Sequence, residues 1–179
     1  MIQDALFADA AKYSIDTNVI VSFLHDSDSE HYPADVFKPQ WEFLERAIKD
    51  GRVVAARRVE TELEKWQNSS PAIKVWLHEH RYLFRDIVSD AQLEGAKRIV
   101  NAYPAYGLDA NRLGDLEVIT LAMAQRLVVV SLEQKAEQHS RKRPKIPNVC
   151  REFGIGCVNL AGFLREEGFG RSDDISRQV

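Results

Sequence analysis

Three consecutive valines, Val128 to Val130, occupy the middle of a short strand predicted over residues 127–131. A strand with one face in water alternates apolar and polar residues, whereas a strand of a parallel sheet is covered on both faces and is apolar at each position. The valines therefore predict a central strand, which the rest of the chain must cover with helices.

Short apolar runs and helical patterns alternate along the sequence. Strands separated by helices form crossover connections, so the alternation predicts an α/β fold with a central, mostly parallel β-sheet flanked by helices. The predicted strands are 12–16, 52–55, 127–131 and 155–158. The predicted helices are 18–24, 39–50, 57–68, 71–85, 90–103, 115–126, 147–153 and 160–167.

A chain of 179 residues with 45% hydrophobic and 28% charged residues has the length and composition of one globular domain. We expect this domain to span 1–167, with a loop insertion at 25–39 and a flexible C-terminal tail at 168–179. The longest nearly apolar stretch, 118–124, is too short to span a bilayer. The first residues lack the features of a signal peptide, so we expect a cytoplasmic protein without a membrane segment.

Two cysteines, Cys150 and Cys157, are too few for a disulfide framework and are expected to be small buried residues. The net charge of −3 is not the signature of a nucleic-acid-binding protein. It does not exclude one, because carboxylates gathered in a metal site lower the net charge without repelling a polyanion once the metal is bound.

Two acidic residues follow predicted strands. Asp16 ends the first strand, and Glu133 lies two residues beyond Ser131, where the central strand ends. Ligands of open parallel sheets bind beyond the carboxyl ends of the strands, which makes both acids candidates for a site. The alternatives are strand-end capping for Asp16 and an ordinary loop acid for Glu133.

Asp115 lies where the pattern of a helix calls for an apolar residue. At about 100° per residue, it falls inside the apolar arc of the predicted helix 115–126, whereas Glu117 points toward solvent. A helix N-cap is the alternative role for Asp115, although a cap and a metal ligand are compatible.

Glu62 flanks the apolar face of the predicted helix 57–68. The alternative to a functional role is an ion pair at the edge of that face with Arg58 or Lys65, worth a few tenths of a kcal/mol.

Four carboxylates at one rim of a sheet would repel one another, by roughly 4 kcal/mol for a pair about 4 Å apart at an effective dielectric constant near 20. Protonation or a bound cation removes this cost. Ligation by oxygen alone favours Mg²⁺ or Mn²⁺, and the five histidines show no zinc-ligand spacing with the cysteines. The acids therefore predict a Mg²⁺ (or Mn²⁺) site.

The acids lie in segments that together resemble a PIN domain. These segments are 14–19 (SIDTNV), 59–63 (VETEL), 115–119 (DLEVI), 129–133 (VVSLE) and 145–150 (KIPNVC). Their order and spacing cover about residues 12–165, and the last segment resembles a poorly characterised bacterial PIN-like subfamily.

The resemblance implies a Rossmann-like three-layer fold with an acidic metal pocket. Asp16, Glu62 and Asp115 match the first three acids of that pocket, and Glu133 matches its variable fourth. Two departures from the pattern are the long separation between Asp16 and Glu62 and a glutamate, rather than the more common aspartate, at Glu133.

The resemblance also implies a Mg²⁺- or Mn²⁺-dependent endoribonuclease, and a VapC-like toxin of a type II toxin–antitoxin pair. Asn18, or Thr17, matches the polar residue that helps to hold the site. Arg57 and Arg58 are candidates for binding the RNA substrate, as is the run 141–143, which is otherwise a solvated loop. The implied protein partners are a small antitoxin and a second copy of the chain.

A binding module is the alternative function. PIN-like folds persist as RNA-binding or protein-interaction domains after losing their chemistry. Metal-dependent cleavage of RNA by the pure protein separates the two hypotheses.

Overall fold

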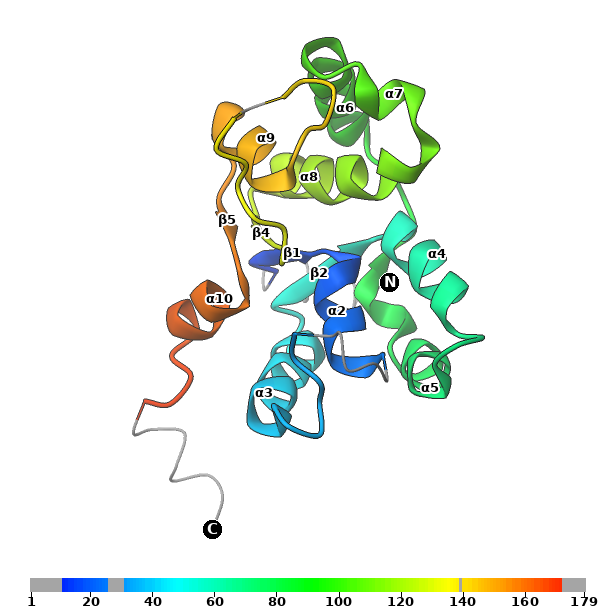
Figure 1. The fold of residues 1–179 in the computed structure, drawn as a ribbon, viewed down its shortest axis with the longest axis vertical. Helices are drawn as coiled ribbons and strands as arrows, with labels where there is room; N and C mark the ends of the chain where they lie inside the picture. The colour runs from blue at the N-terminus through cyan, green and yellow to red at the C-terminus, as the bar shows by residue number, and fades with distance from the viewer. Residues whose placement is uncertain (1–10, 26–30, 139, 172–179) are drawn as a thin grey trace.

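The computed structural model describes residues 11–25, 31–138 and 140–171 (Figure 1). Within them, strands pair in parallel in the order β3-β2-β1-β4-β5. The strands are β1 (Tyr13–Ile15), β2 (Val53–Ala56), β3 (Phe84–Arg85), β4 (Val128–Val130) and β5 (Cys157–Val158). The prediction of an α/β fold around a parallel sheet is confirmed.

Helices cover both faces of this sheet. They are α2 (Thr17–Leu24), α3 (Lys38–Lys49), α4 (Arg57–Trp66), α5 (Pro71–Glu79), α6 (Asp90–Ala102), α7 (Ala105–Leu108), α8 (Leu113–Gln125), α9 (Ile146–Glu152) and α10 (Leu160–Glu166), with short 3-10 helices η1 (Arg81–Leu83) and η2 (Ala110–Arg112).

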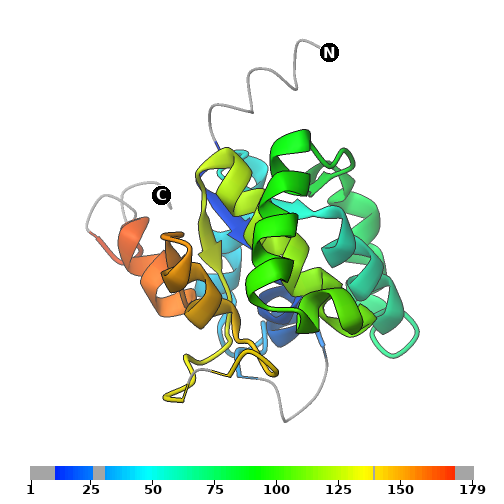
Figure 2. The same cartoon turned by 90° about the horizontal axis from the view of Figure 1, so that it is seen from above.

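The helices form the outer two of three layers. In Figure 1, α2, α3 and α10 lie below the sheet, while α6, α7, α8 and α9 lie above it. Seen from above, α9 and α10 lie at one side of the molecule and α4 and α5 at the other (Figure 2). This is the predicted Rossmann-like three-layer arrangement. None of the helices in the described ranges has the length and apolar character needed to cross a bilayer.

β4, the strand of the three valines, is an interior strand of the sheet, next to the middle strand β1. It pairs with β1 on one side, where Ile15 lies opposite Val130, and with β5 on the other. Val129 and Val130 are fully buried. Cys150 on α9 is buried, as predicted, and Cys157 on β5 is half-buried; both are free thiols.

The strand order reverses between β1 and β4. From β1 the sheet continues through β2 to β3, whereas from β4 it continues to β5. In doubly wound sheets the crevice at such a switch point, beyond the carboxyl ends of the strands, is where ligands bind. The residues that follow the two strands at this switch point are Asp16, after β1, and Ser131, after β4.

The predicted helix 71–85 is wrong beyond Glu79. The backbone leaves the helical conformation at His80, and the chain then forms η1 and β3. β3 is a two-residue edge strand, which is too short to leave a periodic pattern in the sequence. The short elements α7 and η2, between α6 and α8, are likewise absent from the prediction.

The predicted loop insertion at 25–39 is non-helical over 31–37, and α3 begins at Lys38. Residues 26–30 of this insertion lie outside the described residues.

The packed domain extends past its predicted end at 167. Phe169 packs against Phe43 of α3, with ring centroids 5.3 Å apart. The start of the predicted tail is therefore part of the globular structure, because an aromatic ring is packed there. The rest of the tail, 172–179, and the first ten residues lie outside the described ranges.

Candidate functional site

Asp16 lies at the switch point directly after β1 and is 5% exposed. Its backbone N–H donates to the carbonyl of Val130 at 3.0 Å, which continues the pairing of β1 with β4 by one residue. Its carboxylate Oδ2 accepts a hydrogen bond from the hydroxyl of Ser131 at 2.7 Å. The carboxylate is therefore held between the ends of the two central strands.

Ser131 connects the polar groups at the switch point through hydrogen bonds. In the sequence it is distinguished only as the last residue of a predicted strand. Its hydroxyl donates to Asp16 and accepts from Nδ2 of Asn18 at 3.2 Å and from the backbone N–H of Glu133 at 3.1 Å. Asn18 also accepts from the backbone N–H of Leu132 at 3.0 Å. Asn18 thus supports Asp16 through Ser131. A small hydroxyl residue directly after an apolar strand is the signal that identifies such a position.

Glu62 reaches the same region from α4. Its Oε2 accepts a hydrogen bond from the hydroxyl of Thr17, the first residue of α2. Its carboxylate also lies directly against Gly114 in the first turn of α8: a Cβ added there would overlap Oε1 and come 2.6 Å from the carboxyl carbon. Only glycine leaves room for this approach, which places Glu62 beside the residue that precedes Asp115.

Gly114→Ala is expected to displace the Glu62 carboxylate and break its hydrogen bond with Thr17, which should destabilise the protein by about 1 kcal/mol. In an unconstrained helix the same change would stabilise by up to about 1 kcal/mol. The free energy of unfolding in urea measures the effect. The double variant with Glu62→Ala should be more stable than Glu62→Ala alone, by up to about 1 kcal/mol, because the clash is then gone and only the helix preference for alanine remains. Additive effects of the two changes would contradict the close contact.

Asp115 is the third residue of α8 and is partly buried. The N-cap alternative is wrong, because Arg112 occupies that position and makes no side-chain cap. The predicted apolar arc is also too narrow: residues on most sides of α8 are buried, since the helix packs on β1, β2, α4 and α6. Asp115 therefore lies inside the domain, near its edge.

Electrostatics link all four predicted acids. Burial, together with the negative charges of Glu133 and Glu62, raises the pKa of Asp16 to about 7, against the opposing effect of the Ser131 hydrogen bond. Burial raises the pKa of Asp115 to about 8, with further contributions from the charges of Asp16, Glu133 and Glu62 and an opposing one from Arg112. The charges of Glu62 and Glu133 thus act on Asp16 and Asp115, and we call these four residues the acidic cluster.

The acidic cluster fits a hard divalent cation by its donor chemistry. Its ligands would be carboxylate oxygens, which Mg²⁺ and Mn²⁺ prefer. Burial first, and the neighbouring acids second, raise the pKa values of Asp16 and Asp115, so ionising both carboxyls without a counter-charge is unfavourable. In the part of the chain that the structure describes, however, no three acidic, histidine or cysteine side chains converge closely enough to hold a metal ion. The carboxylates would have to move inward to hold one.

Both carboxylate oxygens of Glu133 are bound by residues at the start of α9 or just before it. Its Oε1 accepts from Nζ of Lys145 at 3.0 Å, and its Oε2 accepts from the backbone N–H of Ile146 at 2.8 Å. The loop acid thereby ties the end of β4 to the start of α9. Each of the two oxygens accepts one of these hydrogen bonds and keeps a second lone pair.

Tyr106 of α7 is buried close enough to the acidic cluster for its charges to affect it. No pattern in the sequence distinguishes this tyrosine from an ordinary core residue. Its side chain is fully buried, and its hydroxyl has no hydrogen-bond partner among the described residues. Burial and the charges of Asp115 and Glu133 raise its pKa. An unpaired buried hydroxyl is costly, so Tyr106 stands out as a buried polar group whose hydrogen-bonding capacity is unused among the described residues.

Arg57 and Arg58 are paired with acids of the protein itself. The guanidinium of Arg57 binds Asp86 and, at 3.3 Å, Glu60. Glu117 accepts from the backbone N–H of Arg58 at 3.0 Å and lies 3.7 Å from its Nε. The prediction that Glu117 points toward solvent is wrong, because it anchors the start of α4 to α8. Substrate binding by the two arginines remains a prediction.

The fold and the cluster define a class: a doubly wound α/β protein with buried and half-buried acids near its switch point. Residues 13–170 match the model of a family described as Domain of unknown function (DUF4411), and the chain belongs to that family. A comparison with curated proteins finds no match.

Proposed function

We propose that this protein is a Mg²⁺- or Mn²⁺-dependent endoribonuclease with a PIN-type site. The acidic cluster supports this proposal. Its four members come from four separate segments of the chain, and the charges of Glu62 and Glu133 raise the pKa values of Asp16 and Asp115. Uncompensated carboxylates at a switch point cost stability, and binding a cation that serves phosphodiester hydrolysis offsets that cost.

Each residue of the acidic cluster, and Thr17 beside it, has a role in this proposal. Asp16 and Asp115 hold the cation, joined by Glu133 directly or through water. When bound, the cation supplies Lewis-acid activation and offsets charge on the phosphate. Thr17 fixes Glu62, which ligates or orients the attacking water, and cleavage leaves 5′-phosphate and 3′-hydroxyl ends.

Cleavage of a mixed, structured RNA by the pure protein tests the proposal. We expect cutting with Mg²⁺ or Mn²⁺ and none in EDTA, with products whose 3′ ends a poly(A) polymerase extends without phosphatase treatment. Cutting that persists in EDTA, or products with 3′-phosphates, would contradict a metal-dependent mechanism.

A binding module is the second candidate, and two observations favour it. Glu133 is engaged by Lys145 and Ile146, and the described acids do not converge into a closed metal site. RNA binding of equal strength in EDTA and Mg²⁺, with no cutting by a folded protein, would support this candidate over the nuclease.

The finer proposal is a VapC-like toxin that a small antitoxin holds inactive, in a homodimer. Its basis is the resemblance to PIN domains. Native purification followed by light scattering tests both partners: a toxin should come with a bound second protein, and the complex should have the mass of two chains plus that protein. A bare monomer would contradict both.

A further inference from the structure

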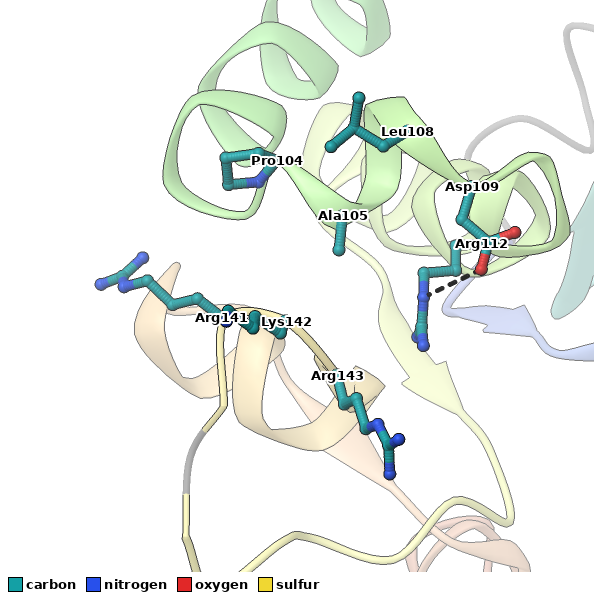
Figure 3. A pocket seen from close by; sticks show the side chains of 8 residues that line it. All are labelled: Pro104, Ala105, Leu108, Asp109, Arg112, Arg141, Lys142 and Arg143. Atoms are coloured by element: carbon teal, nitrogen blue, oxygen red, sulfur yellow. Dashed lines mark ion pairs between the residues drawn. The ribbon is translucent and has the colours of Figure 1, made fainter.

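A groove of about 540 Å³ lies between the α7–η2 segment and the loop that precedes α9. Its lining carries four cations and one carboxylate, in a chain whose net charge is −3. The lining residues are Pro104, Ala105, Leu108, Asp109, Arg112, Arg141, Lys142 and Arg143 (Figure 3). Positive charge is therefore concentrated here against the overall balance of the protein. We call this feature the basic groove.

Arg141 anchors one wall of the basic groove. Its guanidinium donates to the carbonyl of Ala102 at 2.6 Å and to Glu152 at 3.2 Å, and it lies over the ring of Tyr103 at 4.9 Å. These contacts tie the loop to the end of α6 and to α9. The next two residues, Lys142 and Arg143, are thereby held at the groove on a fixed backbone.

Lys142 and Arg143 carry the charge available to a ligand. Both are exposed, and within the described residues their side chains form no hydrogen bond or ion pair. Figure 3 shows Arg143 on one wall and Arg112 on the other, with Arg141 pointing away from both. Arg112 has a carboxylate partner, Asp109, at 3.4 Å. Cations left unpaired along a groove favour a ligand with regularly spaced negative charges.

The basic groove adjoins the acidic cluster at two points. Arg112 lines the groove three residues before Asp115, and its charge lowers the pKa of that carboxyl. Beyond the other wall, Lys145 follows Arg143 by two residues and binds Glu133. The basic groove and the acidic cluster are therefore connected through neighbouring residues on both sides.

Leu108 adds an apolar surface to the rim. It lies at the groove and is 86% exposed. A base face can cover such a side chain only when the base is unstacked, which favours a single strand over a duplex.

We propose that the basic groove binds the backbone of single-stranded RNA and directs it to the acidic cluster. The identity of the polyanion rests on the proposed function, whereas the location of binding rests on the groove itself. Lys142 and Arg143 contact phosphates, and Leu108 contacts a base.

Fluorescence anisotropy with a labelled 20-nucleotide single-stranded RNA, in EDTA so that no cutting occurs, tests this inference. The variant Lys142→Gln/Arg143→Gln should bind at least tenfold more weakly at low salt. Its plot of log affinity against log salt should be shallower by about 0.7 for each phosphate that the variant no longer neutralises. Lys38→Gln/Lys74→Gln removes the same charge from α3 and α5 and should change the affinity less than twofold.

Equal affinities of the two double variants would overturn the inference, as would the absence of RNA binding by the wild type. An unlabelled duplex or polyglutamate that competes as well as the single strand would also overturn it, and would assign the groove to that ligand. The proposed function fails separately, if the wild type does not cut RNA with Mg²⁺ or Mn²⁺.

Discussion

Asp115→Asn is expected to lower the rate of metal-dependent RNA cleavage at least about a hundredfold, and Asp16→Asn to do the same. An amide has nearly the shape of a carboxylate but no charge, so it binds a divalent cation poorly. At Asp16 the amide oxygen can still accept the hydrogen bond of Ser131, which preserves the local structure. The rate of product formation from a labelled RNA, with circular dichroism of each variant, measures the effect.

Asp50→Asn is the matched control. Asp50 precedes β2, at the amino-terminal end of the strands, whereas Asp16 follows the carboxyl end of β1. The exposed ion pair of Asp50 with Arg52 at 3.0 Å contributes little to stability. Its cleavage rate should equal that of the wild type. Full activity of a folded Asp16→Asn or Asp115→Asn variant would contradict the assignment of the site.

The free energy of unfolding without divalent cations is expected to fall as the pH rises from about 4 to about 8. In the unfolded chain both aspartates lose their protons near pH 3.9. In the folded protein Asp16 holds its proton to about pH 7 and Asp115 to about pH 8. The folded state therefore binds more protons across this window, and stability must decrease as the pH increases through it.

Asp115→Asn should remove part of this pH dependence. One pKa unit corresponds to about 1.4 kcal/mol, so after allowance for solvent screening we expect the variant to exceed the wild type by on the order of 2 kcal/mol at pH 8.5. At pH 4 the two should be nearly equal. Urea unfolding in EDTA at both pH values provides the measurement. If the free energy of unfolding of the wild type is the same at both pH values, the ionised forms of Asp16 and Asp115 are not destabilised in the folded protein.

Divalent cations should restore the stability of the wild type at pH 8.5. A cation at a hundred times its dissociation constant adds about 2.7 kcal/mol when it binds only the folded state. The same addition should have little effect on Asp115→Asn, which lacks one ligand. This readout does not depend on cleavage, so it detects a metal site even in a protein that only binds RNA.

The sequence identifies positions more reliably than it identifies partners. Asp16 can be predicted because a carboxylate directly after a buried strand must emerge at the sheet edge. The prediction for Glu117 is wrong, since its partner is the backbone of Arg58 on another helix. Tyr106 has the ordinary appearance of a core aromatic, and only its unpaired hydroxyl beside the acids distinguishes it.

The amino-acid sequence alone dictates the alternation of strands and helices, because burial on both faces of a strand demands apolar residues such as Val128 to Val130. It also indicates which acids lie inside the domain. Tertiary packing determines the partners of each acid. Asp16 accepts a hydrogen bond from Ser131, and Glu62 accepts one from Thr17 and packs against Gly114. These partners are distant in sequence, and local patterns record how deeply a residue is buried but not which segment packs against it.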